Sequence, residues 1–200
     1  MKTAKSKLTR EKLLACAKEL FARYGFNNVT IRDIANAAGL GYGTVYLYFK
    51  DKKAVFYSLL QEVEQDLYTA VKGMAVDLDQ DYPEGLSAYR ALRKDLIAVF
   101  ESFKGNFEII AISRELALTD EAFSAKFFDM RKRLIDRTQK ILEKSNLAHH
   151  LNPQVAAVAI TGMIETTASE WLNQKNPHKL DVKFEELIST LAKLYFKIVS

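Results

Sequence analysis

The sequence predicts an all-α protein, and three observations support this prediction. Three prolines and eight glycines in 200 residues leave few positions for the turns of a β fold. Apolar residues recur at helical spacing along most of the chain. Hydrophobic residues make up 48% and charged residues 27%, which is typical of a globular protein and excludes a disordered one. We expect about nine helices in one or two domains.

The first helix is expected at 9–24. Thr9 is a suitable N-cap, and Gly25 suits the helix end because it lacks a Cβ. The apolar stripe consists of Leu13, Cys16, Ala17, Leu20, Phe21 and Tyr24. Because Cys16 lies on this stripe, we interpret it as a small core residue rather than a redox sensor. The basic segment 1–7 is expected to be a mobile arm that touches the DNA backbone or, equally well, a disordered end without a role.

Two short helices joined by a glycine turn are predicted within residues 30–52. Thr30 is a plausible N-cap, and Asp33 favours the positive end of the first helix. Gly39 suits the left-handed position that ends this helix, and Gly41 can cap a second helix over 42–49. One buried face is formed by Ile31, Ile34, Ala35 and Ala38. This is the helix-turn-helix plan, whose second helix enters the DNA major groove.

The side chains of the second helix divide into a core face and a DNA face. Val45 and Phe49 are four residues apart and should face the core. The others should lie near the groove or its phosphates: Tyr42, Gly43, Thr44, Tyr46, Leu47 and Tyr48. Gly43 lets the backbone approach DNA closely, and the hydroxyl groups can bond to phosphate or base edges. Tyr48 fits equally well as an aromatic at the edge of the core.

This region resembles the DNA-binding region of TetR-family transcriptional regulators over residues 9–57. The matching positions are Leu20-Phe21-Ala22, Gly25-Phe26, Thr30, Ile34-Ala35, Ala38-Gly39, Gly43-Thr44-Val45-Tyr46, Tyr48-Phe49, Lys50 and Lys52. Gly41 departs from the family pattern, which commonly has Ser there. The resemblance implies that Thr30, Arg32, Gly41, Lys50 and Lys52 also belong to the DNA-binding surface, with Arg32 and Lys52 at positions that often hold backbone phosphates.

A long helix is expected to follow Asp51 and to run into the mid-70s. No segment rich in Gly, Pro or Ser interrupts it, so a continuous helix should join a DNA-binding domain (1–52) to an effector-binding and dimerisation domain (53–200). The charge is divided in the same way. Residues 1–53 carry a formal charge of +7 and the remainder carries −3, as expected if one end meets phosphates.

The remaining helices are expected at 86–104, 106–118, 120–146, 153–174 and 182–199, after an acidic break at 77–85. Gly105 is expected to separate the first two, and Asn152-Pro153 to start the fourth. The segment 155–164 is uncharged on every face, and the final helix has an unbroken apolar stripe. We expect a two-fold dimer interface, as in the TetR family, with a monomer as the alternative. Its residues are Val155, Val158, Ala159, Gly162, Leu187, Leu191, Leu194 and Tyr195.

An effector pocket in the C-terminal domain is implied by the family resemblance. The candidate lining is Phe100, Phe103, Phe107, Phe123, Phe127, Ile164, Thr167 and Trp171. Aromatic residues at helical spacing are also typical of an ordinary core. The segment 162–171 is similar to the eighth helix of fatty-acid-responsive members, which implies an acyl-type effector. A basic cluster can meet a charged head group or form a solvated helix face: Arg131, Lys132, Arg133 and Arg137.

The sequence gives no sign of catalysis. It contains no HExxH, GxxxxGK[ST], GxSxG or CxxC motif, and we expect no cofactor. His149-His150 precedes a helix cap and does not have the spacing of a metal site. A single cysteine, with no apolar leader and no apolar run long enough for a bilayer, predicts a cytoplasmic protein.

The predicted function is a dimeric, sequence-specific DNA-binding transcriptional regulator. We expect a repressor that a small apolar ligand releases from a palindromic operator. Two alternatives are an all-α carrier of hydrophobic ligands and a nucleoid-type protein that binds DNA regardless of its sequence. The carrier would not bind a short palindromic duplex. The nucleoid-type protein would bind scrambled DNA with equal affinity.

The DNA-contact assignment makes a testable prediction. Replacing Arg32 or Lys52 by Ala should weaken binding to all DNA sequences and lower the salt dependence of affinity, because phosphate contacts release counterions. Tyr42→Ala should instead change the sequence preference. The measurement is affinity against salt concentration on matched and scrambled duplexes. An unchanged salt slope for Lys52→Ala would rule out the phosphate contact.

Overall fold

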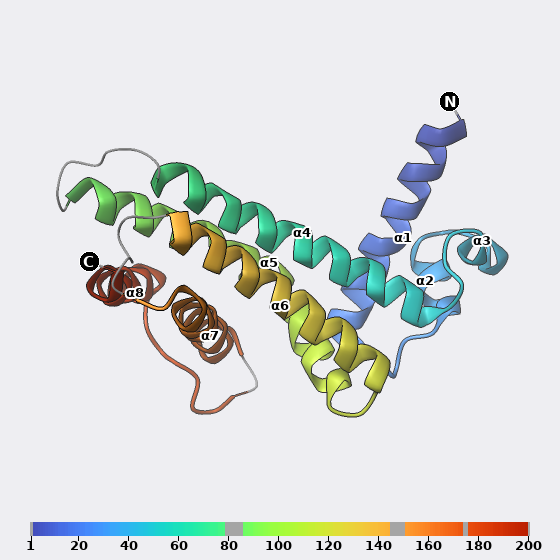
Figure 1. The fold of residues 1–200 in the computed structure, drawn as a ribbon. Coiled ribbons are helices and arrows are strands. Elements are labelled where there is room, and N and C mark those ends of the chain that lie inside the picture. The colour runs from blue at the N-terminus through green and yellow to red at the C-terminus, as the bar shows by residue number, and fades with distance from the viewer. Residues whose placement is uncertain (1, 79–85, 145–150, 174–175, 200) are drawn as a thin grey trace. The chain divides into compact units, whose positions relative to one another are not determined.

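The computed structural model describes residues 2–78, 86–144, 151–173 and 176–199 (Figure 1). These residues form eight helices and no strand, so the all-α prediction is confirmed. The helices are α1 (Lys2–Tyr24), α2 (Ile31–Ala37), α3 (Tyr42–Tyr46), α4 (Lys52–Leu78), α5 (Leu86–Ala117), α6 (Glu121–Lys144), α7 (Pro153–Leu172) and α8 (Phe184–Val199). Most of the expected acidic break at 77–85, and His149-His150, lie outside the described residues.

The chain packs as two compact units. Unit 1 comprises residues 1–64 and 108–124, and unit 2 comprises residues 65–107 and 125–200. Three helices, α4, α5 and α6, therefore contribute residues to both units. The packing of unit 1 extends beyond residue 52, and the functional division at that residue stays a prediction. Among the described residues, no helix has the length and apolar character needed to cross a bilayer.

An aromatic cluster of Phe21, Phe26, Phe56 and Phe123 forms the core of unit 1. Phe26 lies 5.5 Å from Phe21, 5.3 Å from Phe56 and 5.3 Å from Phe123, measured between ring centroids. Each ring is at least nine-tenths buried. The rings come from α1, the following loop, α4 and α6, so this cluster joins segments about 100 residues apart in the sequence. Edge-to-face aromatic pairs stabilise a core beyond the burial of their area.

The start of the first helix corrects two expectations. Helix α1 begins at Lys2, so Thr9 is not an N-cap, and residues 2–7 are helical instead of forming an arm. The Thr9 hydroxyl donates to the Lys5 carbonyl at 2.9 Å, as in a helix interior. The preceding Lys, Ala and Ser residues contain no helix breaker, and a capping residue inside such a segment does not by itself stop the helix. Gly25, at φ +77°, ends α1 as predicted.

The two helices expected on either side of Gly105 are one helix, α5. Gly105 is exposed, and a Cβ added there would meet nothing within 4 Å. A glycine in a helix interior costs about 1 kcal/mol relative to alanine. Burial of apolar residues on both sides, including Phe103 and Ile109, outweighs this cost. The Asn106 amide also donates to the Ser102 carbonyl at 3.0 Å and to the Asp66 carboxylate at 3.1 Å.

Unit 2 contains the remaining parts of α4, α5 and α6 together with α7 and α8. Helix α7 begins at Pro153, as predicted, and the Asn152 side chain accepts from the Gln154 and Val155 N–H groups at 3.1 Å. The Trp171 ring stacks on Phe184 at 5.3 Å, which joins α7 to α8. The α7 residues Ala157 and Ala168 are completely buried, so the small residues of this helix permit close packing within the unit.

Two glycines provide a matched test of this backbone. Gly39→Ala should lower the free energy of unfolding by about 1 kcal/mol, because φ is +64° there and a Cβ is disfavoured. Gly105→Ala should raise it by about 0.5–1 kcal/mol, because this residue lies inside a continuous helix with open space around its Cβ position. Urea denaturation measures both. A loss of stability in Gly105→Ala would contradict the continuous α5.

Candidate DNA-binding surface and ligand pocket

A capping box fixes the start of α2. The Thr30 hydroxyl and backbone N–H donate to the Asp33 carboxylate at 2.6 and 2.8 Å, and the Asp33 N–H donates to the Thr30 hydroxyl oxygen at 3.2 Å. These bonds from Thr30 hold the pKa of the Asp33 carboxyl below its ordinary value. The arrangement satisfies two backbone N–H groups at once and fixes where α2 begins.

The turn between α2 and α3 depends on Gly39. With φ at +64°, this residue allows the Leu40 N–H to donate to the Ala35 carbonyl at 2.9 Å. Gly41 then precedes α3, and its carbonyl accepts from the Thr44 N–H at 2.8 Å. Gly41 makes no side-chain cap bond. The turn therefore fixes α3 through backbone conformation rather than through a side-chain cap.

Helix α3 presents a mixed polar and apolar surface to solvent. Val45 and Phe49 are buried, at 0% and 3% exposure, as the helical spacing predicted. Tyr42 and Tyr46 are 47% and 46% exposed, and Leu47 is 81% exposed. The helix ends at Tyr46 rather than at Phe49, because the next residues form turns. Burial of one face therefore fixes which side chains remain available to a partner.

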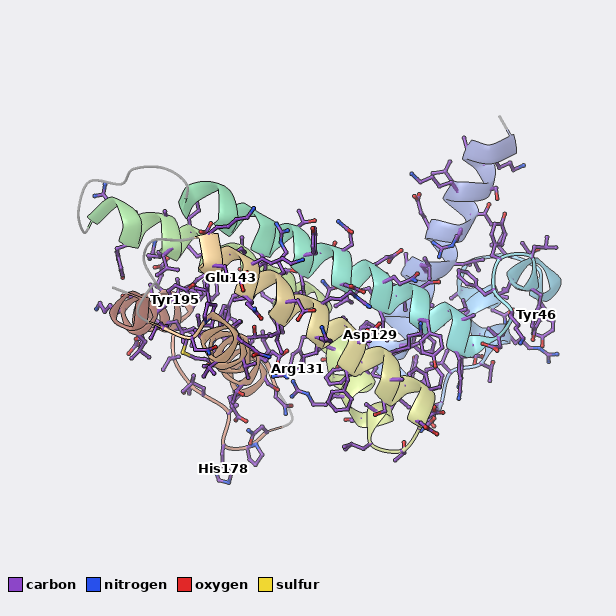
Figure 2. The ribbon with its side chains drawn as sticks, viewed as in Figure 1. Tyr46, Asp129, Arg131, Glu143, His178 and Tyr195 are labelled. Carbon is purple, nitrogen blue, oxygen red and sulfur yellow. The ribbon has the colours of Figure 1, made fainter. Side chains whose placement is uncertain are left out.

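An arginine and two tyrosines are joined on this surface, and we call them the tyrosine cluster: Arg32, Tyr42 and Tyr46. The two phenol oxygens lie 2.7 Å apart, and the rings meet edge to face with 5.1 Å between their centroids. Figure 2 labels Tyr46 beside α3. The hydrogen bond with Tyr42 raises the pKa of Tyr46. The Arg32 guanidinium carbon lies 5.6 Å from the centre of the Tyr42 ring. These contacts hold the exposed rings in a defined arrangement.

Lys52 has partners within the protein. Its ammonium donates to the Phe26 carbonyl at 2.7 Å and to the Asn27 carbonyl at 3.5 Å, and lies 4.3 Å from the centre of the Phe26 ring. Burial lowers the pKa of Lys52. Sequence reasoning assigned this side chain to a phosphate and missed its role at the start of α4. That role depends on a loop 25 residues away, which no local pattern indicates.

The other predicted DNA-binding residues lie on or beside the same helix pair. Thr30, Arg32, Gly41, Gly43 and Lys50 are exposed. Thr44, Tyr48 and Lys52 are half-buried. The structure therefore brings the predicted residues together around α2, α3 and the start of α4 in unit 1.

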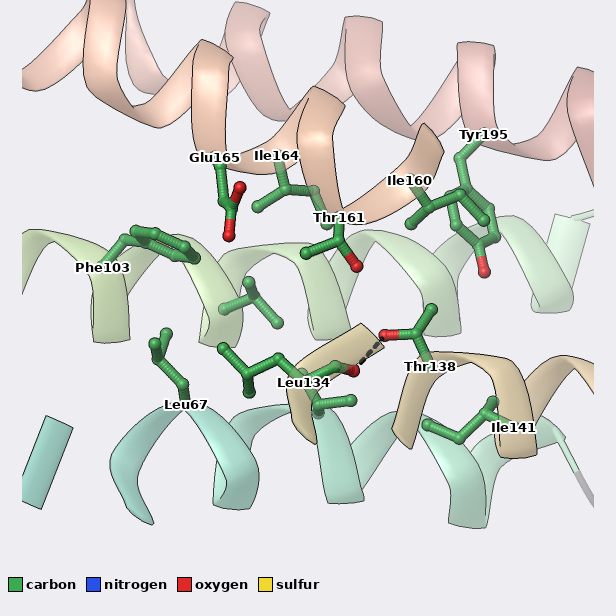
Figure 3. Close-up of a pocket in the computed structure, with 12 residues that line it drawn as sticks. Leu67, Phe103, Leu134, Thr138, Ile141, Ile160, Thr161, Ile164, Glu165 and Tyr195 are labelled. Carbon is green, nitrogen blue, oxygen red and sulfur yellow. Dashed lines mark hydrogen bonds between the residues drawn. The ribbon is translucent and has the colours of Figure 1, made fainter. Parts of the chain in front are cut away.

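Unit 2 contains a largely apolar pocket (Figure 3). A mainly apolar lining with a few polar groups is typical of ligand sites. Eight apolar residues line it: Leu67, Val71, Val99, Phe103, Leu134, Ile141, Ile160 and Ile164. Four polar residues complete the wall: Thr138, Thr161, Glu165 and Tyr195. The lining comes from α4, α5, α6, α7 and α8.

Only Phe103 and Ile164 of the eight predicted lining residues belong to this wall. Phe100 is fully buried outside the lining, and Phe123 belongs to the aromatic cluster of unit 1. The Trp171 indole N–H donates to the Val182 carbonyl at 3.0 Å. The other three predicted residues also lie outside the lining: Phe107, Phe127 and Thr167. Sequence reasoning overlooked the aliphatic lining, since such residues have the same periodicity whether they face a core or a pocket.

The predicted basic cluster on α6 is divided among separate partners. Arg131 Nε donates to Glu165 Oε2 at 2.9 Å. Lys132 pairs with Asp136 at 2.5 Å, and Arg133 pairs with Asp129. Arg137 donates to the Tyr68 hydroxyl at 3.1 Å and lies over its ring, with 4.5 Å between the guanidinium carbon and the ring centre. These four contacts go to four different residues: Glu165, Asp136, Asp129 and Tyr68.

The predicted dimer residues divide by burial. Val155, Val158 and Leu194 are 66%, 45% and 48% exposed, and Ala159 is also exposed. Gly162 is half-buried, with its Cβ position 4.0 Å from an Arg131 nitrogen. The other three are 4% exposed within one chain and are not available to a partner in this conformation: Leu187, Leu191 and Tyr195. One side of the α8 stripe therefore packs inside its own unit, and the dimer interface stays a prediction.

The geometry of unit 1 defines a helix-turn-helix protein with an exposed second helix. The comparisons agree. Residues 13–59 match the family model for bacterial regulatory proteins of the tetR family. The chain is 24% identical to the transcriptional repressor BepR of Brucella suis, over 92% of this chain and 90% of that protein. It is 24% identical to the fatty acid metabolism regulator protein of Bacillus subtilis, over 85% and 86%.

A crystal structure described as a TetR-family regulator from Syntrophomonas wolfei has the same fold, with a TM-score of 0.75 and 21% identity over 96% of this chain and 95% of that one. Residues 13–59 therefore match the DNA-binding domain of the tetR family, and over most of its length the chain is similar to regulators of transcription. Its relatives are regulators of transcription, which indicates a non-enzymatic protein.

Variants of Lys52 and of the nearby Lys50 test whether the contact between Lys52 and Phe26 stabilises the fold. Lys52→Met should lower the free energy of unfolding by about 1 kcal/mol, because the Phe26 carbonyl loses a charged donor. Lys50→Met, at an exposed position, should leave it within about 0.5 kcal/mol. Urea denaturation without DNA gives both values. Equal stability of the two variants would show that the contact with Phe26 does not contribute to folding.

Proposed function

We propose that the chain is a dimeric repressor that binds a palindromic operator and is released by a small, largely apolar ligand. The main supporting observation is the exposure of Tyr42, Tyr46 and Leu47 on a helix whose other face is buried. Large aromatic and aliphatic side chains rarely remain exposed together on so short a helix without a partner. A basic N-terminal segment with this surface suits nucleic acid.

The exposed side chains have distinct expected roles in the groove. Arg32 contacts a phosphate, which positions the domain without reading the sequence. The Tyr42 and Tyr46 hydroxyls bond to phosphate or base edges, and their mutual bond limits the orientations they sample. Leu47, at the C-terminal end of α3, is suited to contact with a thymine methyl group. Lys50 contributes charge at the edge of the same surface.

Dimerisation is supported by exposed apolar side chains in unit 2. Val155 and Val158 on α7 and Leu194 on α8 are large apolar residues of the predicted interface that remain exposed. A two-fold dimer presents two copies of α3, which requires half-sites in adjacent major grooves about 34 Å apart. The operator is therefore roughly palindromic.

Release by a ligand requires a link between the pocket and the DNA-binding unit, and α6 is suited to this role. Its first turn belongs to unit 1, where Phe123 packs in the aromatic cluster and the preceding Asp120 pairs with Lys53 at 2.5 Å. Further along the same helix, Leu134 and Ile141 line the pocket. A ligand favours the released state only if it binds that state more tightly than the DNA-bound one.

The ligand is expected to be acyl-like, and the protein to act in the cytoplasm. One relative is named a fatty acid metabolism regulator protein, and the pocket wall is mainly aliphatic.

The carrier alternative accounts for the pocket but leaves the exposed surface of α3 without a role. The nucleoid-type alternative accounts for the charge but leaves the pocket without one.

The operator proposal is tested by selecting duplexes from a random pool at about 150 mM salt. We expect the selected sites to be palindromic and to bind at least about 1,000-fold more tightly than scrambled duplexes. Tyr42→Ala and Leu47→Ala should alter the selected bases, while Lys132→Ala, on the exposed face of α6, should select the wild-type sequence. Equal affinity for scrambled DNA would support the nucleoid-type protein, and absence of DNA binding would support the carrier.

A further inference from the structure

Two hydroxyl groups in the pocket wall have no hydrogen-bond partner among the described residues. They belong to Tyr195, which is 4% exposed, and to Thr161. The other polar lining residues are already engaged. The Thr138 hydroxyl donates to the Leu134 carbonyl at 3.1 Å, and Glu165 accepts from Arg131. Neither oxygen is among the fully enclosed unpaired polar atoms of the described residues, so both remain accessible to a group bound in the pocket.

The two hydroxyl groups are placed to meet the same ligand. Figure 3 shows Tyr195, from α8, and Thr161, from α7, with their hydroxyls directed toward the space lined by Thr138 and Leu134. The surrounding wall is aliphatic, and Ile160 lies between the two side chains in the same view. A ligand with a polar oxygen at one end can therefore bond here while its chain contacts Leu134 and Ile141.

The charges around the pocket are unfavourable for an anion. Glu165 is the one charged side chain in the described lining, and its partner Arg131 already neutralises it. Burial, and to a smaller extent the carboxylate of Asp95, raise the pKa of Tyr195 to about 12. The phenol therefore stays protonated and donates. A charged group placed beside it would lose its hydration and find no unengaged side chain of opposite charge in the described lining.

We propose that this pocket binds an uncharged molecule with an aliphatic chain and a polar oxygen, such as an alcohol, ester or ketone, whose oxygen accepts a hydrogen bond from Tyr195 and contacts Thr161. The proposal rests on the proposed function, because it names the chemical class of the effector. It excludes free fatty acids, acyl groups carrying phosphates, and cationic amphiphiles as the preferred ligands of this site.

The test compares ligands of equal chain length on the full-length protein by titration calorimetry: 1-decanol, decanoate and decyltrimethylammonium. We expect 1-decanol to bind at least about tenfold more tightly than either charged compound, because burying an uncompensated charge is costly. Tighter binding of decanoate or of the ammonium compound overturns the proposal. Absence of binding by all three overturns it as well.

Three conservative variants separate the hydrogen bonds from general packing. Tyr195→Phe should weaken 1-decanol binding about three- to tenfold and Thr161→Val by less, because each removes one neutral hydrogen bond. Thr166→Val, at an exposed position of α7 outside the pocket lining, is the matched control. Its affinity for 1-decanol should stay within about twofold of wild type. Unchanged binding in Tyr195→Phe, with an unchanged melting temperature, contradicts the assignment.

Operator binding is measured separately on the same proteins. If operator DNA binds and decanoate releases it, the regulatory function stands and the uncharged-ligand inference fails. If 1-decanol binds to the pocket with no effect on operator affinity, the pocket chemistry stands and ligand-controlled release fails. The two proposals therefore fail on different measurements.

Discussion

Packing around Phe26 is the constraint on which unit 1 depends. Its ring contacts Phe21, Phe56 and Phe123, and its carbonyl accepts from Lys52. These contacts bring the loop after α1 against α4 and the start of α6. Because Lys52 lies at the first residue of α4, the same interaction fixes the helix that follows the DNA-binding surface. Loss of this packing would disturb every element that holds α3 in position.

Because Val45 and Phe49 are buried, the opposite face of α3 remains exposed as a binding surface. A short helix with two buried residues on one face presents its remaining side chains in a fixed direction. The hydrogen bond and ring contact between Tyr42 and Tyr46 reduce the freedom of the exposed tyrosines, so less conformational entropy remains to be lost on binding. Rigid support beneath an exposed polar and aromatic surface is what specific recognition of DNA requires.

Unit 2 follows a different physical plan, in which an aliphatic wall surrounds a few polar groups. Leu134 and Ile141 supply nonspecific affinity, whereas the hydroxyls of Tyr195 and Thr161 orient a ligand. Arg131 neutralises Glu165 within the protein, so the wall carries little net charge. Helix α6 therefore contributes Leu134 and Ile141 to the pocket of unit 2 and Phe123 to the aromatic cluster of unit 1.

The sequence by itself determined the features that depend on short-range physics. The Thr30–Asp33 capping box, the left-handed Gly39 and the buried faces of α2 and α3 all follow from residues within a few positions of one another. Only the tertiary structure decided the rest: Phe123 in the aromatic cluster, Lys52 on a distant carbonyl, Gly105 inside a helix, and Tyr195 in a pocket rather than at an interface. Each depends on contacts between residues far apart in the chain. Periodicity indicates that a side chain is buried, but it does not indicate which residues that side chain packs against.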